Sequence, residues 1–421
     1  MNSARVLKKF ATNEPRAALE AEQLAKLRSL LNAIVPANAF YTAKLRDCGE
    51  ITSLEDFTRL VPYTTKTELL EDQKAHPPYG SNLTFPLERY TRFSQTSGTS
   101  AEPLRWLDTP ESWEWMLGNW QTIYRAAGAS AGDRVFFAFS FGPFLGFWTS
   151  FEAAAKLGLL CIPGGGLSSE ARMRAIIETS ATILCCTPTY ALRLGEIGSA
   201  GSRVHTIIVA GEPGGSITST RAQIERLWPG ARVFDHHGMT EVGPVSYECP
   251  ERPGTLCVIE PSYVAEIIDP LTGQPVGRGE NGELVLTTLG RTGSPLLRYR
   301  TGDVVKKGFV NDTLAFEGGI LGRSDDMVIV RGVNVYPTAV ERIIRQHADI
   351  AEYRVELRAS GVMAEIAITI EPTDGCAAPA ALAAKLETEL KSAFALRIPV
   401  FVAVPGALPR FEMKAKRWVR L

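Results

Sequence analysis

Small hydroxyl side chains gather around a single glycine in one short run of the sequence, residues 94–103. A turn at Gly98 can direct successive backbone N–H groups into one cavity, which is how a short loop binds an anion. Hydroxyl donors are available nearby from Thr96, Ser97, Thr99 and Ser100. The run therefore predicts a phosphate-binding loop, with an ordinary solvated loop as the alternative.

Four other segments share this polar, glycine-marked character, and each would suit a loop that contacts a ligand. They are residues 210–213, 235–241, 299–303 and 322–337. A basic cluster follows near the C-terminus, at Lys414, Lys416 and Arg417. Taken singly, each segment is equally consistent with solvated surface.

In order along the chain, these segments resemble the motif series of the adenylate-forming superfamily, which includes acyl-CoA synthetases, luciferases and the adenylation domains of peptide synthetases. The motifs are TSGTS followed by EP at 96–103, GMTEVGP at 238–244, YRTGD at 299–303, GRSDDMVIVRGVNVYPTAVE at 322–341 and PRFEMKAKR at 409–417. Residues 53–57 and 61–66 also fit the phenylacetate–CoA ligase branch of that superfamily. The resemblance covers nearly the whole chain.

The resemblance implies a two-step reaction that uses ATP, Mg²⁺ and coenzyme A. A carboxylate would attack the α-phosphorus of ATP and release pyrophosphate, and a thiol would then displace AMP from the acyl adenylate. A small C-terminal domain would rotate between the two steps. One alternative is an enzyme that passes the acyl group to a carrier-protein thiol or an amine. A second is a nucleotide-binding homologue with weak catalysis.

The resemblance also implies roles for the residues that would surround the nucleotide. Glu241 matches the carboxylate that holds Mg²⁺ against the phosphates, because a hard cation prefers oxygen ligands, and Thr240 would bond the α-phosphate. The adenine would be lined by Gly211, Glu212 and Pro213, and by Asp235, His236, His237 and Gly238. The two histidines could equally be ordinary residues at a strand end, and Glu241 a solvated loop residue.

Further roles fall on the second half of the chain. Asp303 matches the carboxylate that accepts hydrogen bonds from the ribose hydroxyls, since it is an acceptor-only group. Arg323 would lie near the ribose or phosphates, and Asp325 matches the hinge. Gly332 matches a backbone position beside the pantetheine passage. Lys414 matches the lysine that stabilises the adenylation transition state as a point charge.

Three departures from the family pattern qualify these assignments. Ala101 and Met413 stand where relatives usually have glycine, so the phosphate loop and the turn before Lys414 are expected to differ locally. Cys249 and Cys257 occupy positions that many relatives use for structural zinc. Because residues 304–321 contain no cysteine or histidine to complete a tetrahedral site, we expect this zinc site to be lost.

The pocket for the acid is the least defined part of the site. Residues 139–148 are rich in aromatic side chains, and the glycines at 164–166 could admit a flat substrate. Aromatic runs are more often core than pocket. The preference of the branch for aryl and arylacetic acids supports an aromatic acid.

Elements predicted from hydrophobic periodicity would position these motifs. A helix is expected at 17–34, and strands at 135–139, 159–162, 182–186 and 206–210 alternate with helices at 148–157, 168–180 and 218–227. This alternation predicts a largely parallel, covered sheet. Antiparallel strands follow at 282–288, 303–306 and 314–316.

The final part of the chain predicts a small α+β domain. Strands are expected at 327–330, 353–357, 364–370 and 399–404, and helices at 337–347 and 379–394. We therefore expect an α/β protein with a large N-terminal domain over residues 1–322, which also contains a β-rich subdomain, and a mobile C-terminal domain over residues 323–421.

Composition limits the partners. The 421 residues carry a net charge of −1, which gives no electrostatic reason to expect nucleic acid or an anionic membrane as a partner. Seven cysteines with irregular spacing do not form a disulfide framework. No secretory signal or membrane span is expected, so we predict a cytoplasmic protein that acts on a small carboxylic acid; homodimerisation is left open.

Overall fold

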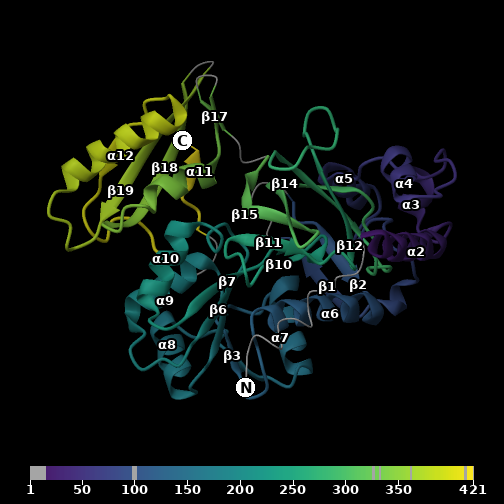
Figure 1. Cartoon of the computed structure of the whole chain (residues 1–421), viewed down its shortest axis with the longest axis horizontal. Helices are drawn as coiled ribbons and strands as arrows, with labels where there is room; N and C mark the ends of the chain where they lie inside the picture. Colours follow the sequence, from purple (N-terminus) through teal and green to yellow (C-terminus); the bar gives the residue numbers. More distant parts are fainter. Residues whose placement is uncertain are drawn as a thin grey trace.

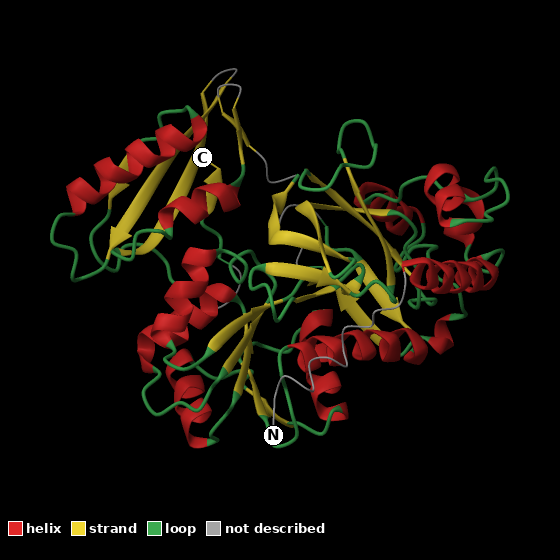
Figure 2. Cartoon of the chain, in the orientation of Figure 1, coloured by secondary structure: helices red, strands yellow, loops and turns green. Residues whose placement is uncertain are grey.

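The computed structural model describes residues 16–96, 102–324, 328–330, 333–360, 363–411 and 415–420. Figure 1 shows two regions of unequal size, with the smaller, C-terminal one beside helices α9 and α10. Residues 16–324 are called here the N-terminal unit and residues 328–420 the C-terminal unit. Figure 2 shows that both contain sheets covered by helices.

A five-stranded parallel sheet lies in the N-terminal unit, with strand order β4-β3-β5-β6-β7. Its strands are β3 (Arg134–Phe137), β4 (Leu160–Pro163), β5 (Ile183–Cys186), β6 (Thr206–Val209) and β7 (Arg232–Asp235). The helices between them are α7 (Leu145–Lys156), α8 (Ser169–Glu178), α9 (Pro188–Gly198) and α10 (Thr218–Leu227). The predicted strand and helix alternation is confirmed.

A six-stranded antiparallel sheet packs beside it, with order β10-β11-β15-β14-β13-β12. The strands are β10 (Ser246–Glu248), β11 (Thr255–Val258), β12 (Tyr263–Ile268), β13 (Asn281–Thr288), β14 (Tyr299–Val310) and β15 (Thr313–Arg323). Strands β14 and β15 are longer than predicted. β14 begins at Tyr299 and therefore contains the whole segment 299–303. β10, β11 and β12 were not predicted.

Smaller elements join these sheets. The antiparallel pair β1 (Arg92–Gln95) and β2 (Arg105–Asp108) flanks the hydroxyl-rich run, and β8 (Gly238–Met239) pairs with β9 (Gly243–Pro244). The helices of the first part are α2 (Arg16–Ile34), α3 (Ala39–Lys44), α4 (Leu54–Leu60), α5 (Lys66–Ala75), α6 (Pro110–Ala126) and the short 3₁₀ turn η1 (Leu87–Arg89). The helix predicted at 17–34 is thus confirmed as α2.

The C-terminal unit contains a sheet of order β17-β16-β19-β18-β21, with β20 also paired to β19. Its elements are β16 (Val328–Val330), β17 (Val333–Val335), α11 (Pro337–Ile344), β18 (Ile350–Ser360), β19 (Met363–Pro372), α12 (Pro379–Phe394), β20 (Val400–Val402) and β21 (Trp418–Arg420). Pro337 and Pro379 occupy the first turns of their helices, where the missing N–H has no cost.

Separate hydrophobic cores support the two units. One cluster, which includes Val335, Leu386 and Ile398, draws only on the C-terminal unit. The others draw only on the N-terminal unit, and the largest packs α6 against both of its sheets through side chains such as Met116 and Phe316. The predicted α/β class with a small α+β unit is confirmed, while the exact boundary and the mobility stay predictions. Among the described residues, no helix is long and apolar enough to cross a membrane.

Candidate functional site

The backbone around Thr240 and Glu241 is held by a fully buried arginine. Arg291 donates two hydrogen bonds to the carboxylate of Asp108, at 2.7 and 2.6 Å, and both residues are 0% exposed. Its remaining terminal nitrogen donates to the carbonyl oxygens of Thr240 and Glu241, at 2.7 and 2.8 Å. The planar guanidinium presents several N–H donors in fixed directions, which lysine cannot do. It therefore holds the loop between β8 and β9 to Asp108.

The Glu241 side chain lies in a small polar cluster. Its carboxylate is almost completely buried and accepts a long hydrogen bond from the hydroxyl of Tyr299, at 3.5 Å. The Nζ atom of Lys66, the first residue of α5, is 3.8 Å from the same carboxylate oxygen. Burial, followed by the negative charge of Glu241, holds the pKa of Tyr299 well above its usual value. Tyr299 therefore remains a neutral donor.

Strand β14 also carries Asp303, four positions after Tyr299. One Asp303 oxygen accepts from Nε2 of His237 at 2.9 Å, and the other accepts from Nη1 of Arg323 at 3.2 Å. His237 and Asp303 are both buried, at 9% and 5% exposure. Residues of the sequence segments 235–241, 299–303 and 322–337 thus meet at the Asp303 carboxylate.

Gly302 allows this meeting. Its φ is +77°, a conformation that favours glycine, and a Cβ added there would lie 2.9 Å from Nη2 of Arg323. A larger residue would push Arg323 away from Asp303.

Asp235 and Glu248 form a second buried acidic group behind the histidines. The hydroxyl of Ser216 donates to Asp235 at 2.6 Å, and Arg221 donates to Glu248. Burial raises the pKa of Asp235 to about 6 and that of Glu248 to about 7, and the charge of Arg221 opposes both shifts. Asp235 therefore carries a proton well above the pH at which an exposed aspartate loses it.

His236 and His237 have different surroundings. The His236 ring lies edge-on to Trp120, with centroids 4.3 Å apart, and burial lowers its pKa to about 3. Within the described part of the chain, the Nδ1 atoms of both histidines are buried without a hydrogen-bond partner. His236 is thus a neutral ring in the core. His237 contacts Asp303 through Nε2, while its Nδ1 remains without a hydrogen-bond partner among the described residues.

Glu212 follows strand β6 between Gly211, at φ +91°, and Pro213. Its Oε1 accepts from the backbone N–H of Thr189 at 2.8 Å, in the first turn of α9. Its Oε2 accepts from the backbone N–H of Ala415 in the C-terminal unit, at 3.1 Å. The prediction that this carboxylate lines the base is untested, and both of its oxygens have other partners here.

Several predicted residues lie outside the described residues, namely Ser97, Gly98, Thr99, Ser100, Ala101, Asp325, Gly332, Met413 and Lys414. Thr96, at the edge of this loop, is buried, and its hydroxyl accepts from the backbone N–H of Leu104 at 3.0 Å. Gly238 begins β8, close to the carbonyl oxygen of Gly243.

Cys249 and Cys257 lie together, because β10 and β11 are antiparallel neighbours. They pack with the apolar side chains of Val310 and Ala315. A hydrogen bond between the two thiols lowers the pKa of Cys249 and raises that of Cys257. No group of three or more His, Cys, Asp or Glu side chains suited to a metal is present among the described residues. The loss of zinc stays a prediction.

Aromatic rings cluster at the carboxyl end of β3 and on α7. Phe139 stacks on Phe147 with centroids 4.0 Å apart, and Phe141 contacts Trp148 and Phe151 edge-on. Trp148 is 41% exposed, so the cluster reaches the surface rather than closing into the core. A Cβ added at Gly165 would touch the Phe139 carbonyl at 3.5 Å, which places the glycine-rich turn directly against these rings.

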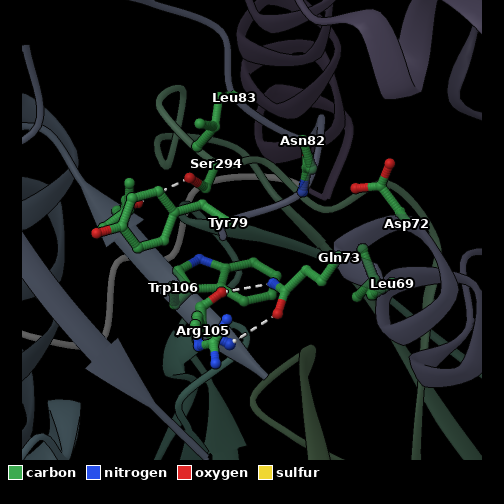
Figure 3. Close-up of a pocket in the computed structure, with 10 residues that line it drawn as sticks. Leu69, Asp72, Gln73, Tyr79, Asn82, Leu83, Arg105, Trp106 and Ser294 are labelled. Atoms are coloured by element: carbon green, nitrogen blue, oxygen red, sulfur yellow. Dashed lines mark hydrogen bonds between the residues drawn. The ribbon is translucent and has the colours of Figure 1, made fainter. Parts of the chain in front are cut away.

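A separate small pocket lies between α5 and β2 (Figure 3). Gln73 and Arg105 exchange two hydrogen bonds at its rim, at 2.7 and 3.0 Å. Trp106 lines the pocket and also packs against the Arg291 guanidinium, 5.1 Å from its ring centre. None of the described residues that were predicted for the site lines this pocket.

Sequence reasoning missed three residues that the structure brings to Glu241. Lys66 lies in a segment, 61–66, that was noted only as part of the resemblance, and Tyr299 stands in a motif whose role was assigned to Asp303 alone. Arg291 had no signal in the sequence, because its partner Asp108 is 183 positions away.

Comparison with known proteins places the chain in a family. Residues 96–290 match the AMP-binding enzyme family, and residues 332–420 match the AMP-binding enzyme C-terminal domain. The phenylacetate-coenzyme A ligase of Pseudomonas putida is 30% identical over 94% of this chain and 93% of that protein. That of Aromatoleum evansii is 32% identical over 88% of this chain and 86% of that protein.

Solved structures of 2-hydroxyisobutyryl-CoA ligase extend the comparison to the arrangement of the units. The postadenylation state of that protein, in complex with 2-HIB-AMP, has a TM-score of 0.90 at 25% identity, covering 97% of this chain and 90% of that chain. Its thioesterification state, in complex with 2-HIB-AMP and CoA, has a TM-score of 0.71 at 26% identity, covering 97% and 91%. The present chain belongs to the AMP-binding enzymes, in the branch of AMP-forming acid–CoA ligases that includes the phenylacetate–CoA ligases.

Proposed function

We propose that this protein activates a carboxylic acid, in our view an aromatic one, with ATP and transfers the acyl group to coenzyme A. In the first step, a carboxylate oxygen bonds to the α-phosphorus, the bond to the bridging oxygen breaks, and pyrophosphate leaves. In the second, the CoA sulfur bonds to the acyl carbon and AMP leaves with the electron pair. The observation that carries the proposal is the meeting of Glu241, Tyr299 and Asp303 around strand β14.

The residues around Glu241 fit Mg²⁺ and phosphate. The buried Glu241 carboxylate would supply a hard oxygen ligand of the kind that Mg²⁺ prefers. When bound, the cation would neutralise phosphate charge and let an anionic acid approach. Arg291 keeps the Thr240 and Glu241 backbone in place, so the Thr240 side chain would be directed at the α-phosphate without reorganisation.

Asp303 would accept hydrogen bonds from the ribose. Each of its oxygens already has a partner, His237 or Arg323, but a carboxylate oxygen has two lone pairs and can accept again. His237 would then contact the base or sugar through its face or its unpartnered Nδ1. A side chain at position 302 would displace Arg323 from Asp303, which explains the need for Gly302.

The predicted residues outside the described part of the chain would complete the two half-reactions. Residues 96–100 would hold the departing pyrophosphate, Lys414 would stabilise the adenylation transition state, Asp325 would act as the hinge, and Gly332 would border the CoA passage. The cytoplasmic location stays a prediction.

The aromatic acid is supported by two observations. Relatives over most of the chain are phenylacetate-coenzyme A ligases, and the partly exposed rings of Phe139, Phe147 and Trp148 lie against the Gly165 turn. A ring placed among them would gain edge-on and stacked contacts.

Acid-dependent exchange of pyrophosphate into ATP tests this function. We expect exchange with aryl or arylacetic acids and less with short hydroxy acids such as 2-hydroxyisobutyrate, and we expect CoA to discharge the adenylate. Glu241→Gln should lower the exchange rate by about 10²–10³-fold, the scale for one preorganised electrostatic group. No exchange with any acid of a broad panel would instead indicate a weak nucleotide-binding homologue. Exchange without CoA discharge would indicate another acceptor.

A further inference from the structure

The carboxylate of Glu212 connects the two units through backbone groups alone. Its two oxygens accept the N–H of Thr189 in the N-terminal unit and the N–H of Ala415 in the C-terminal unit, at 2.8 and 3.1 Å. Thr189 lies in the first turn of α9, whose N-terminal end favours a negative charge. The carboxylate is therefore fixed on the N-terminal unit and offers its second oxygen to the C-terminal unit.

Arg417 makes a second contact between the two units, again at Thr189. It is only 6% exposed and donates to both oxygens of Glu352, at 2.6 and 3.2 Å. Its Nη1 also reaches the hydroxyl of Thr189 at 3.4 Å and Glu341 at 3.4 Å. Thr189 thus donates its N–H to Glu212 and accepts from Arg417 with its hydroxyl oxygen, so the start of α9 is connected to residue 417 directly and to residue 415 through Glu212.

The contacts of Ala415 and Arg417 involve residues close in sequence to Lys414, the lysine predicted to stabilise the adenylation transition state. Ala415 directly follows Lys414 in the sequence, and three residues later β21 begins and pairs in parallel with β18. The segment 415–420 is therefore held in the C-terminal unit by strand pairing and against the start of α9 by the hydrogen bond of Arg417 to Thr189.

The arrangement of the units matches one state of a solved relative more closely than another. The TM-score is 0.90 with the postadenylation state of 2-hydroxyisobutyryl-CoA ligase and 0.71 with its thioesterification state. Both comparisons use the same protein, so the chain as a whole is more similar to its postadenylation state than to its thioesterification state.

We propose that Glu212 is a positioning residue for the adenylation half-reaction, and that with Thr189 and Arg417 it forms a latch that holds the segment 415–417 against α9 in this arrangement. The inference rests on the proposed function. Formation of the thioester would require the latch to open, because Ala415 cannot keep Glu212 as a partner, nor Arg417 keep Thr189, once the C-terminal unit turns. Glu212 then acts through backbone placement rather than by contact with the base.

The half-reactions test the latch. Glu212→Gln keeps the size of the side chain but replaces one acceptor oxygen by an N–H donor that faces a backbone N–H. We expect the turnover rate of pyrophosphate–ATP exchange to fall about 10-fold, the scale of one lost hydrogen bond to a charged group. The KM for ATP and the discharge of supplied acyl adenylate by CoA should stay within about twofold. Equal loss in both half-reactions, or a change in the KM for ATP alone, would overturn the inference.

Thr189→Val is the second variant, since it removes the acceptor of Arg417 and retains the backbone N–H. It should affect the half-reactions in the same direction as Glu212→Gln. Glu20→Gln is the matched control, because Glu20 is an exposed residue of α2 that pairs only locally with Arg16. It should leave both half-reactions unchanged.

Hydrogen exchange of the ligand-free protein separates failure of the latch from failure of the proposed function. In Glu212→Gln and Thr189→Val, the amides of residues 415–417 should exchange about 10-fold faster than in the wild type, while the later amides of α9 should stay protected. If they do not, the latch is wrong whatever the activity. If these amides do exchange faster, but the wild type shows no pyrophosphate–ATP exchange with any acid, the proposed function fails and the contact stands.

Discussion

Buried charges at single residues hold the backbone around the candidate nucleotide site. The Arg291–Asp108 pair is completely buried, and Arg221 binds the buried carboxylate of Glu248 while its own side chain stays 13% exposed. Such pairs add little net stability, because desolvation opposes their attraction, but removal of one partner leaves a costly unpaired charge. Their value here is geometric: Arg291 can contact two carbonyl oxygens and a carboxylate at once.

Asp235 leads to a prediction about pH. Burial raises its pKa in the folded protein to about 6 from an ordinary value of 3.8, so the folded state binds the proton more tightly than the unfolded state. This contribution to stability is fully present below about pH 4 and is lost as the pH rises through about 6. Between pH 4 and 7, the stability of Asp235→Asn should therefore improve relative to the wild type by roughly 1–3 kcal/mol.

Urea unfolding of both proteins at several pH values measures this difference. His236 titrates over a similar range in the opposite direction, because burial lowers its pKa to about 3, but it is present in both proteins and cancels in the comparison. A stability difference that is independent of pH would contradict the prediction.

At the scale of elements, helix α5 is docked on strand β14, and this docking brings Lys66 to Glu241. Thr64 forms a bridge with Tyr299, with backbone hydrogen bonds of 3.0 and 2.9 Å to Arg298 and Arg300. The next residue, Thr65, begins α5 with a capping box in which Thr65 and Glu68 satisfy each other's backbone N–H groups. The start of the helix, and with it Lys66, is thus fixed from both sides.

Thr65→Ala tests this coupling between helix start and site. Loss of the cap should lower the free energy of unfolding by about 1 kcal/mol, and the looser position of Lys66 should also slow pyrophosphate–ATP exchange by roughly twofold to fivefold. Ser53→Ala is the matched control: it removes the cap of α4, where Ser53 accepts from Asp56, and should cost similar stability without slowing exchange. Equal slowing in both variants would show that the effect is not local.

At the scale of the whole molecule, each hydrophobic cluster of the described residues belongs to one of the two units. The C-terminal cluster contains Val330, Val355 and Leu390 but no residue of the N-terminal unit, and the polar contacts of Glu212 and Arg417 connect the two units through single hydrogen bonds. Burial of apolar surface is the main source of folding free energy. Because no hydrophobic cluster of the described residues includes side chains of both units, we expect each unit to have most of its own stability.

Calorimetry should therefore record two unfolding transitions rather than one. The smaller enthalpy would belong to the C-terminal unit, since unfolding enthalpy scales with the number of residues. ATP with an acid substrate should bring the two transitions closer, because ligand bound between the units stabilises both. A single transition whose calorimetric and van't Hoff enthalpies agree would contradict the independence of the cores.

Local patterns were sufficient for most of the fold. The helix predicted at 218–227 and the helix predicted at 379–394 match α10 and α12, because apolar spacing and first-turn prolines are properties of adjacent residues. Strand β14 was predicted too short, since the polar residues of the segment 299–303 were interpreted as a loop. A buried polar side chain such as Asp303 on a strand needs hydrogen-bond partners, and here they are His237 and Arg323, which lie on other segments of the chain.

The sequence by itself determined the order of the motifs, the element types and the family to which they point, because each depends on residues close together in the chain. Only the tertiary structure decided what those residues contact. The Glu212 carboxylate meets Ala415 across 203 positions, and Arg291 meets Asp108 across 183. Hydrogen bonds of this kind follow from how sheets and units pack, and no local spacing encodes them, so the candidate latch and the support for Glu241 emerged only from the folded chain.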